Sequence, residues 1–397
     1  MHRARGEFGM PIEENPAESA ECVAQTMRSS LLFVHPGSLG DAILALAALR
    51  GLHARFHFAR RIFVGQQQIG QLFLHCGEVD MALSFEHTLW TDCLLSRDTW
   101  QASTERIMDS VSHAVVWMND ADGTVAANLK RAGIPWTSVR SPNSTDLEQE
   151  HQEDRYLEIL RDWDVRRPAW RPLCPMEKLH VSGSPLLVIH PGSGSPHKCL
   201  PPQIWAEAVR QLISREPAWT IALIGGPADE ITLWGLRRAL DRHQVQVFHN
   251  YELATIASLL ASADLFWGHD SGPTHVAAAA GTPTVAVFGP TSPARWAPRG
   301  PFVRVVQGSA CQCRTWDDVR ACVSKPCLAI DPAQIVQHSQ AMLGGLATVS
   351  SFTKGRPAWR NHGHLTCLSR TPMVHCRARC RNIVIFCEDR WNLCRMP

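Results

Sequence analysis

The sequence predicts an α/β protein with a doubly wound parallel sheet in each of two domains. An apolar strand followed by a His-Pro-Gly-Ser turn occurs twice in the chain. The first copy is LLFVHPGSLGD from Leu31, and the second is LLVIHPGSGS from Leu186. After each copy, short apolar runs alternate with segments of helical periodicity, which is typical of parallel sheets covered by helices. The copies begin about 150 residues apart, the length of one domain.

Each half follows the same order of elements. In the first half we expect a strand at 31–34, a helix at 42–56, and strands at 61–65 and 111–120. In the second half we expect strands at 186–190, 219–226, 245–248, 264–270 and 282–290, and helices at 202–214, 228–240, 252–263, 272–280 and 331–346. The strands are short apolar runs bounded by glycine or polar residues, as buried parallel strands are.

These patterns predict the domain boundaries. We expect a disordered extension at 1–28, a first Rossmann-like domain at 29–165, a proline-rich linker at 166–185, a second Rossmann-like domain at 186–346, and a disordered tail at 347–397. Residues 351–397 hold nine basic and two acidic side chains together with five cysteines, and most of that stretch has no helical or strand periodicity.

Composition excludes some classes of function. A net charge of +2 is too small to indicate a nucleic-acid partner. The start of the chain has no apolar signal-peptide core, and no later run approaches the roughly 18 apolar residues of a membrane span. We therefore expect a cytoplasmic protein whose 14 cysteines are mostly free thiols.

The two HPGS turns lie where a strand ends and a helix begins, a position whose unpaired N–H groups bind anions. Neither copy matches the G-x-G-x-x-G or the Walker pattern, so nicotinamide and P-loop chemistry are not indicated. Asp41 follows the first turn, either as a helix-stabilising acid worth roughly 1 kcal/mol or as a base that takes a proton from a hydroxyl. Lys198 follows the second, either as a phosphate ligand or as a solvated surface lysine.

The stretch from Asp264 to Pro290 is the most informative in the chain. A strand leads into a polar loop and then into an alanine-rich helix that is small enough to pack closely on a sheet. The loop presents Asp270, Ser271, Thr274 and His275 together at the helix N-terminus. So many hydrogen-bonding groups at one strand end indicate a site for a nucleotide diphosphate.

Taken together, GSLGDAILALAALR, the strand–HPGS–Lys segment, DLFWGHDSGPTHVAAAAGTPTVAVFGP and CVSKPCLAIDPAQIV resemble glycosyltransferase family 9, the ADP-heptose:lipopolysaccharide heptosyltransferases. The resemblance covers roughly residues 30–346. It implies a GT-B fold, two Rossmann-like domains that face each other across a cleft. The first domain would hold the acceptor, and the second would hold the nucleotide-sugar donor.

The resemblance also implies roles for particular residues. Asp41 would be the general base of an inverting transfer that needs no metal or cofactor, and His35 and Gly40 would lie on the acceptor side. The donor-binding residues would be Ser193, Lys198, Asp270, Ser271, Gly272, Thr274 and His275. The donor would be a nucleotide sugar, ADP-heptose, and the acceptor a lipopolysaccharide core or a related lipid-linked glycan at the cytoplasmic face of the inner membrane.

Three positions depart from the family pattern. His35 stands where the family usually has arginine, and His269 stands where it usually has asparagine. The usual Lys-x-Trp-Pro is Lys-Cys-Leu-Pro at 198–201, without the tryptophan.

Two weaker patterns remain. Cys311, Cys313, Cys322 and Cys327 have the spacing C-x-C-x8-C-x4-C, without the C-x2-C pairs typical of zinc sites, so we expect no metal there. Four arginines flank a helix of the first half, either as a solvated face or as a patch that steers an anionic acceptor at a membrane surface: Arg50, Arg55, Arg60 and Arg61.

Two other functions fit the same domain pattern. A nucleotide-sugar epimerase also uses two Rossmann-like domains, and it would act on a donor without any acceptor. A catalytically degenerate glycan-binding protein is the alternative outside enzymes, and the presence of Asp41 argues against it.

Overall fold

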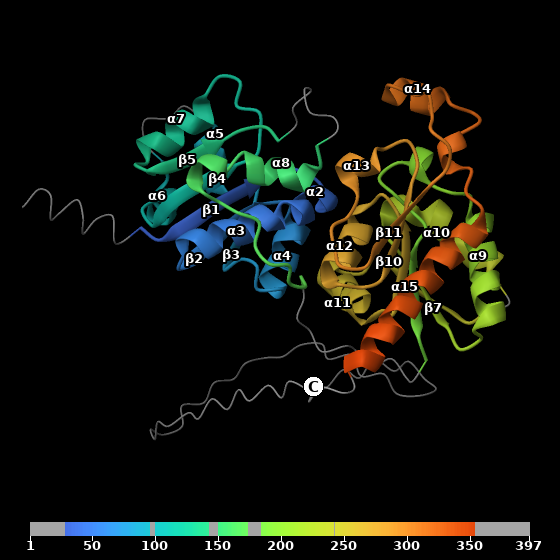
Figure 1. Cartoon of the computed structure of the whole chain (residues 1–397). Helices are drawn as coiled ribbons and strands as arrows, with labels where there is room; N and C mark the ends of the chain where they lie inside the picture. The colour runs from blue at the N-terminus through green and yellow to red at the C-terminus, as the bar shows by residue number, and fades with distance from the viewer. Residues whose placement is uncertain (1–27, 96–99, 143–149, 174–183, 242, 354–397) are drawn as a thin grey trace, which may run out of the picture. The chain divides into compact units, whose positions relative to one another are not determined.

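The computed structural model describes residues 28–95, 100–142, 150–173, 184–241 and 243–353 (Figure 1). The chain divides into a compact unit over 1–349 and a second unit over 350–397. The predicted extension up to residue 27, part of the predicted linker and the tail beyond 353 lie outside the described residues. The four predicted boundaries therefore stay predictions.

The first half forms a five-stranded parallel sheet of order β3-β2-β1-β4-β5. Its strands are β1 (Ser30–His35), β2 (Arg60–Gly65), β3 (Met81–Ser84), β4 (Val111–Val116) and β5 (Trp136–Val139). Its helices are α2 (Leu39–Leu44), α3 (Leu46–Phe56), α4 (Gln67–His75), α5 (Thr88–Leu94), α6 (Ala102–Met108), α7 (Thr124–Arg131) and α8 (Gln152–Glu158), followed by a 3₁₀ turn at Arg161–Trp163.

The second half forms a six-stranded parallel sheet of order β11-β10-β9-β6-β7-β8. Its strands are β6 (Leu186–His190), β7 (Thr220–Gly225), β8 (Val245–His249), β9 (Leu265–His269), β10 (Thr284–Phe288) and β11 (Val303–Gln307). Its helices are α9 (Pro202–Arg215), α10 (Glu230–Ala239), α11 (Leu253–Ser262), α12 (Gly272–Ala280), α13 (Pro293–Trp296), α14 (Trp316–Ala321) and α15 (Pro332–Thr353), with 3₁₀ turns at Pro196–Lys198, Pro227–Asp229 and Pro326–Leu328.

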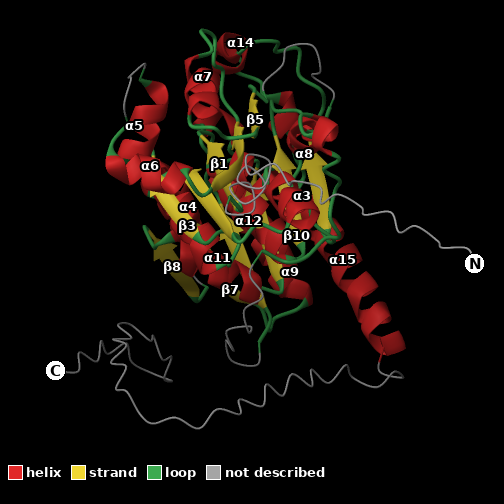
Figure 2. Ribbon diagram, turned by 90° about the vertical axis from the view of Figure 1, so that its left-hand side faces the viewer, coloured by secondary structure: helices red, strands yellow, loops and turns green. Residues whose placement is uncertain are grey.

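Successive residues of β1 and of β6 point to opposite faces of their sheets. Helices cover both faces (Figure 2). Leu31 and Phe33 of β1 face one apolar cluster, whereas Leu32 and Val34 face another. In the second half, the alternate residues of β6 divide in the same way. These layers confirm the doubly wound α/β class expected from the sequence.

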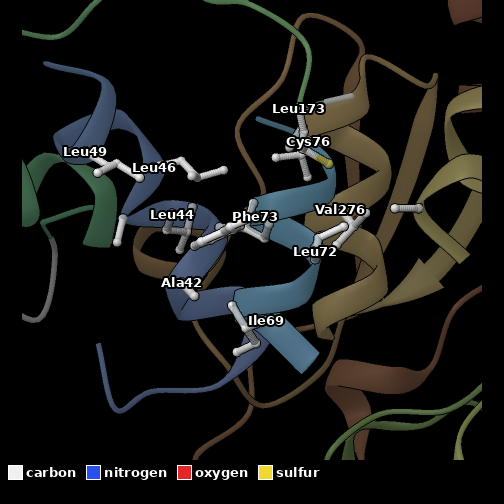
Figure 3. Packing of buried hydrophobic residues seen from close by; sticks show 14 of the residues in the cluster. Ala42, Leu44, Leu46, Leu49, Ile69, Leu72, Phe73, Cys76, Leu173 and Val276 are labelled. Carbon is white, nitrogen blue, oxygen red and sulfur yellow. The ribbon is translucent and has the colours of Figure 1, made fainter. Parts of the chain in front are cut away.

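One apolar cluster is common to the two halves. It runs from α2, α3 and α4 to α11 and α12, and includes Leu173 of the segment that joins the halves. Figure 3 shows Leu72 and Phe73 of α4 between side chains of α2 and Val276 of α12. The loops at the starts of α2 and α12 are thereby held near each other.

The structure corrects several expected elements. The strand expected at 111–120 ends at Val116, and the helix expected at 331–346 continues to Thr353. The helix expected at 42–56 begins at Leu39 and is divided between α2 and α3 at Ala45. The sequence did not predict strands β3, β5 and β11. They are short strands at the edges of the sheets, their residues are mostly half-buried or exposed, and none has a continuous apolar run. No helix in the described part of the chain is both long enough and apolar enough to cross a bilayer.

Candidate active site

Each HPGS turn follows the strand at which the strand order of its sheet reverses. β1 lies between β2 and β4, and β6 lies between β7 and β9. In open parallel sheets such a reversal leaves room for a ligand at the carboxyl ends of the strands. The predicted site residues of both halves lie at or after the carboxyl ends of these strands or of β9 beside them.

Asp41 lies in the first turn of α2, and Ser38 is the residue that caps this helix. The Ser38 N–H and Oγ–H both donate to Asp41 Oδ2, at 3.0 and 2.6 Å. Asp41 is thus the third residue of α2, and its helix-stabilising role is real. Within the described residues these bonds reach Oδ2, so Oδ1 is the oxygen that is left to accept a proton.

His35 is buried behind this turn. The Tyr156 hydroxyl lies 2.9 Å from Nε2, and the Gly37 N–H donates to Nδ1 at 3.1 Å. Burial lowers the pKa of His35 to about 4, although the charge of Asp41 opposes this. His35 is thus a neutral, rigid support at pH 7. A β-carbon at Gly37 would lie 2.6 Å from the His35 ring and 2.9 Å from Asp41 Cβ, so this turn requires glycine.

In the second half, three of the six other predicted donor-side residues lie against Asp270, namely Ser193, Lys198 and His275. Lys198 Nζ donates to its Oδ2 and to its backbone carbonyl, each at 2.9 Å, and Ser193 Oγ donates to the same carbonyl. Thr291, which the sequence did not single out, donates to Oδ2 at 2.8 Å. The side chains therefore converge from three separate loops.

The Asp270 carboxylate is held ionised. Burial opposes ionisation, but the His275 ring, whose Nε2 lies 3.9 Å from Oδ1, and the charge of Lys198 hold the pKa of Asp270 well below the usual range. His275 Nδ1 is buried and has no hydrogen-bond partner among the described residues. An unpaired buried ring nitrogen beside the N-terminus of α12 is an atom that a bound ligand would satisfy.

His190, the last residue of β6, links two loops of this site. Its Nδ1 lies 3.0 Å from Ser271 Oγ, and its Nε2 lies 3.1 Å from Asp229 Oδ2. Ser271 also contacts the hydroxyl of Thr274. The sequence did not indicate Asp229, because nothing local distinguishes it from the other acidic residues on surface helices.

The two predicted loops contact each other. A β-carbon at Gly40 would lie 3.0 Å from Cδ2 of His275, and one at Gly272 would lie 2.8 Å from Leu39. Each glycine therefore makes room for a side chain of the opposite loop. This contact brings the loop of Asp41 beside the loop of Asp270, with the N-termini of α2 and α12 together.

A model of glycosyltransferase family 9 (heptosyltransferase) matches residues 123–325, which is half of the chain. The chain belongs to this family. Lipopolysaccharide heptosyltransferase 1 of Pseudomonas aeruginosa is 34% identical over 111 residues, or 28% of this chain and 30% of the relative. Lipooligosaccharide heptosyltransferase 2 of Haemophilus influenzae is 28% identical over 141 residues, which are 34% of this chain and 40% of the relative. The matches thus span well under half of these relatives.

Solved structures confirm the GT-B fold. A family 9 glycosyltransferase from Veillonella parvula aligns with a TM-score of 0.64 at 16% identity, covering 80% of this chain and 98% of that chain. ADP-heptose lipopolysaccharide heptosyltransferase II of E. coli aligns with a TM-score of 0.62 at 20% identity, covering 80% of this chain and 99% of that chain. Identities this low are informative about the fold alone.

His269 shows how this family 9 chain accommodates one departure from the usual pattern. The Leu200 N–H donates to His269 Nε2 at 2.8 Å, and Nδ1 lies 3.2 Å from the Gly192 carbonyl. The ring therefore carries its proton on Nδ1. An asparagine side chain also offers one acceptor and one donor, so His269 ties the loop of Lys198 to β9 by bonds of the same kind.

The arginine patch of the first half carries less free charge than its sequence suggests. Arg50 pairs with Glu78, Arg61 with Asp80, and Arg55 approaches Asp164 at 3.9 Å. These ion pairs neutralise much of the positive potential. Contact of this patch with an anionic membrane stays a prediction.

Proposed function

We propose that this family 9 protein is an inverting glycosyltransferase that uses Asp41 as its general base. The observation that carries the proposal is the contact of the Asp41 loop with the Asp270 loop at Gly40 and His275. A carboxylate is thereby beside the loop that contacts Lys198 and begins α12 with its free N–H groups. That is the pairing required to take a proton from an attacking hydroxyl and to stabilise a leaving phosphate.

In the proposed reaction, an acceptor hydroxyl attacks the anomeric carbon of the donor and loses its proton to Asp41. The bond from that carbon to the diphosphate breaks, and the diphosphate leaves with the bonding electrons. Lys198, which now pairs with Asp270, and the N–H groups that begin α12 would stabilise the departing charge. These groups supply positive potential without a metal ion.

The donor we propose is a nucleotide-activated heptose, ADP-heptose, and the acceptor a lipopolysaccharide core glycan. The support is the family and the names of the two curated relatives, both lipopolysaccharide or lipooligosaccharide heptosyltransferases. A lipid-linked acceptor of this kind would bring the enzyme to the cytoplasmic face of the inner membrane. Ser193, Ser271, Gly272, Thr274 and His275 would line the donor side.

Replacement of the proposed base tests this function. The Asp41→Asn variant keeps an oxygen that can accept the Ser38 N–H, so α2 should stay capped. We expect its transfer of heptose to a lipopolysaccharide core fragment to fall by about 10²–10⁴-fold, the contribution of a general base. Thermal stabilisation by ADP should survive, because the donor loop is intact.

A matched variant controls for the capping effect. Asp318 has the same position in the capping box of α14, outside the Asp41 and Asp270 loops, and Asp318→Asn should transfer at the wild-type rate. Near wild-type turnover by Asp41→Asn would exclude Asp41 as the base. Conversion of ADP-heptose by the wild-type protein without any acceptor would indicate an epimerase or hydrolase instead.

A further inference from the structure

The connection between β11 and α15 contains a segment with little apolar burial, in which Cys311 packs against the apolar cluster of the second half. None of the residues 309–326 is buried, and the two large apolar side chains Trp316 and Val323 are 47% and 95% exposed. Ordering a residue costs about 1–2 kcal/mol of backbone entropy, which burial normally offsets. Some other interaction must hold this segment in one conformation.

Hydrogen bonds in the segment are mostly local. Thr315 and Asp318 cap the short helix α14, and this capping box involves only neighbouring residues. Where the segment begins and ends, the Gly308 N–H donates to the Cys327 carbonyl at 3.0 Å. These contacts order a helix of six residues, but they do not attach it to the sheet.

Three cysteines are among the few half-buried residues of the segment, and they face one another. The sulfur atoms of Cys311, Cys313 and Cys322 all lie within 4.8 Å of one another. Cys311 Sγ is 2.9 Å from Cys313 Sγ and 4.0 Å from Cys322 Sγ. Sulfurs bound 2.3 Å from one tetrahedral zinc ion would be separated by about 3.8 Å, which is within this range.

Cys327 offers a fourth sulfur from the body of the domain. It is buried in the apolar cluster formed by β6, β7, β10 and α9. Cys311 packs against this same cluster, which places it at the edge of the region that holds Cys327. A metal ion bound to all four sulfurs would join the segment to the sheet.

We propose that Cys311, Cys313, Cys322 and Cys327 bind one zinc ion as four thiolates. This reverses the expectation from their spacing, which lacks C-x2-C pairs. The sequence could not show that α14 folds back and returns Cys322 to Cys311. Soft thiolate ligands in a tetrahedral set favour zinc, and four protein ligands leave no open position for catalysis. The ion is structural.

The position of Cys327 in the fold indicates that the ion would support the loop that follows β10. A β-carbon at Gly289 would lie 2.9 Å from Leu328, so the residue after Cys327 packs against the loop that follows β10. Gln307 donates to the Gly289 carbonyl at 2.8 Å. That loop carries Thr291, which donates to Asp270. The zinc site would therefore stabilise the loop that carries Thr291.

Elemental analysis of the full-length protein, purified under reducing conditions without chelator, tests the site. We expect about one zinc per chain in the wild type. The Cys311→Ser and Cys322→Ser variants should each lose it, with a fall of about tenfold or more in zinc content. Cys76→Ala, which removes a buried cysteine of the first half, and the tail variant Cys376→Ser/Cys380→Ser should keep it.

A second measurement avoids variants that fail to fold. Titration of wild-type protein with a thiol-modifying reagent, in the presence of a zinc-sensitive dye, should release the ion together with the modification of four thiols. Wild-type protein without stoichiometric metal, or zinc content unchanged in Cys311→Ser and Cys322→Ser, would overturn the site. Iron in place of zinc would overturn the choice of metal. Two missing thiols without metal would identify a disulfide instead.

Discussion

At the scale of single residues, buried histidines support both loops of the site in their neutral form. Burial lowers the pKa of His35 to about 4 and that of His269 to about 3. In the unfolded chain each would titrate near pH 6.5. Between that pH and the lowered pKa, the unfolded state binds a proton that the folded state does not. The free energy of unfolding therefore falls as the pH falls through this window.

His269 gives a direct test of this pH dependence. Asparagine at position 269 can still donate to the Gly192 carbonyl and accept from the Leu200 N–H, but it does not titrate. From pH 6 to pH 5 we expect His269→Asn to lose about 1 kcal/mol less unfolding free energy than the wild type, measured by urea denaturation. His269→Ala, which also removes both bonds, should be less stable than His269→Asn at pH 7. Parallel pH profiles for wild type and His269→Asn would contradict this account.

How far the sequence predicts the site depends on which residues are adjacent in the chain. Asp41, Lys198 and Asp270 follow apolar strands, so their placement at the sheet edges could be expected. Tyr156, Asp229 and Thr291 reach the same edges from other segments, and their contacts with His35, His190 and Asp270 depend on packing. No local pattern marks such residues.

At the scale of secondary-structure elements, the N-termini of α2 and α12 fit together through two glycines. Gly40 accommodates the His275 ring, and Gly272 accommodates Leu39. The sequence predicts both helices but does not predict this contact, because each glycine alone is sufficiently explained as part of a turn. Each glycine therefore lacks a side chain for two reasons, because it belongs to a turn and because a side chain of the opposite loop occupies the space beside it.

A double-mutant cycle tests this fit. Gly272→Ala should lower the free energy of unfolding by about 1–3 kcal/mol, the usual cost of overpacking. Leu39→Ala in the same chain should recover part of that loss, with a coupling energy of about 0.5–3 kcal/mol. Gly344→Ala is the control, because a β-carbon there meets nothing within 4 Å, and it should cause no loss. Purely additive effects of Leu39→Ala and Gly272→Ala would show that these loops do not press on each other.

At the scale of the whole compact unit, a short segment ties the two sheets to each other. Arg171, just before the undescribed part of the predicted linker, donates to Glu78 Oε2 at 2.7 Å. Arg50 donates to the same carboxylate and to the Arg171 carbonyl. Two residues further, the Leu173 N–H donates to the Ala279 carbonyl of α12 at 2.8 Å. A pattern of prolines predicts a linker here, but not that it is anchored at both sides.

Glu78 is the acidic partner of both arginines, and its side chain is fully buried. Glu78→Gln keeps the shape of the side chain but leaves two guanidinium groups without their counter-charge. Breaking a buried pair costs about 3–5 kcal/mol, and because Arg171 is 48% exposed, water reduces the penalty to about 2 kcal/mol. Urea denaturation measures it. Glu158→Gln removes the partner of the exposed Arg161 and should cost less than about 0.5 kcal/mol. Equal losses in the two variants would mean that the Glu78 carboxylate does not hold the segment against the first sheet.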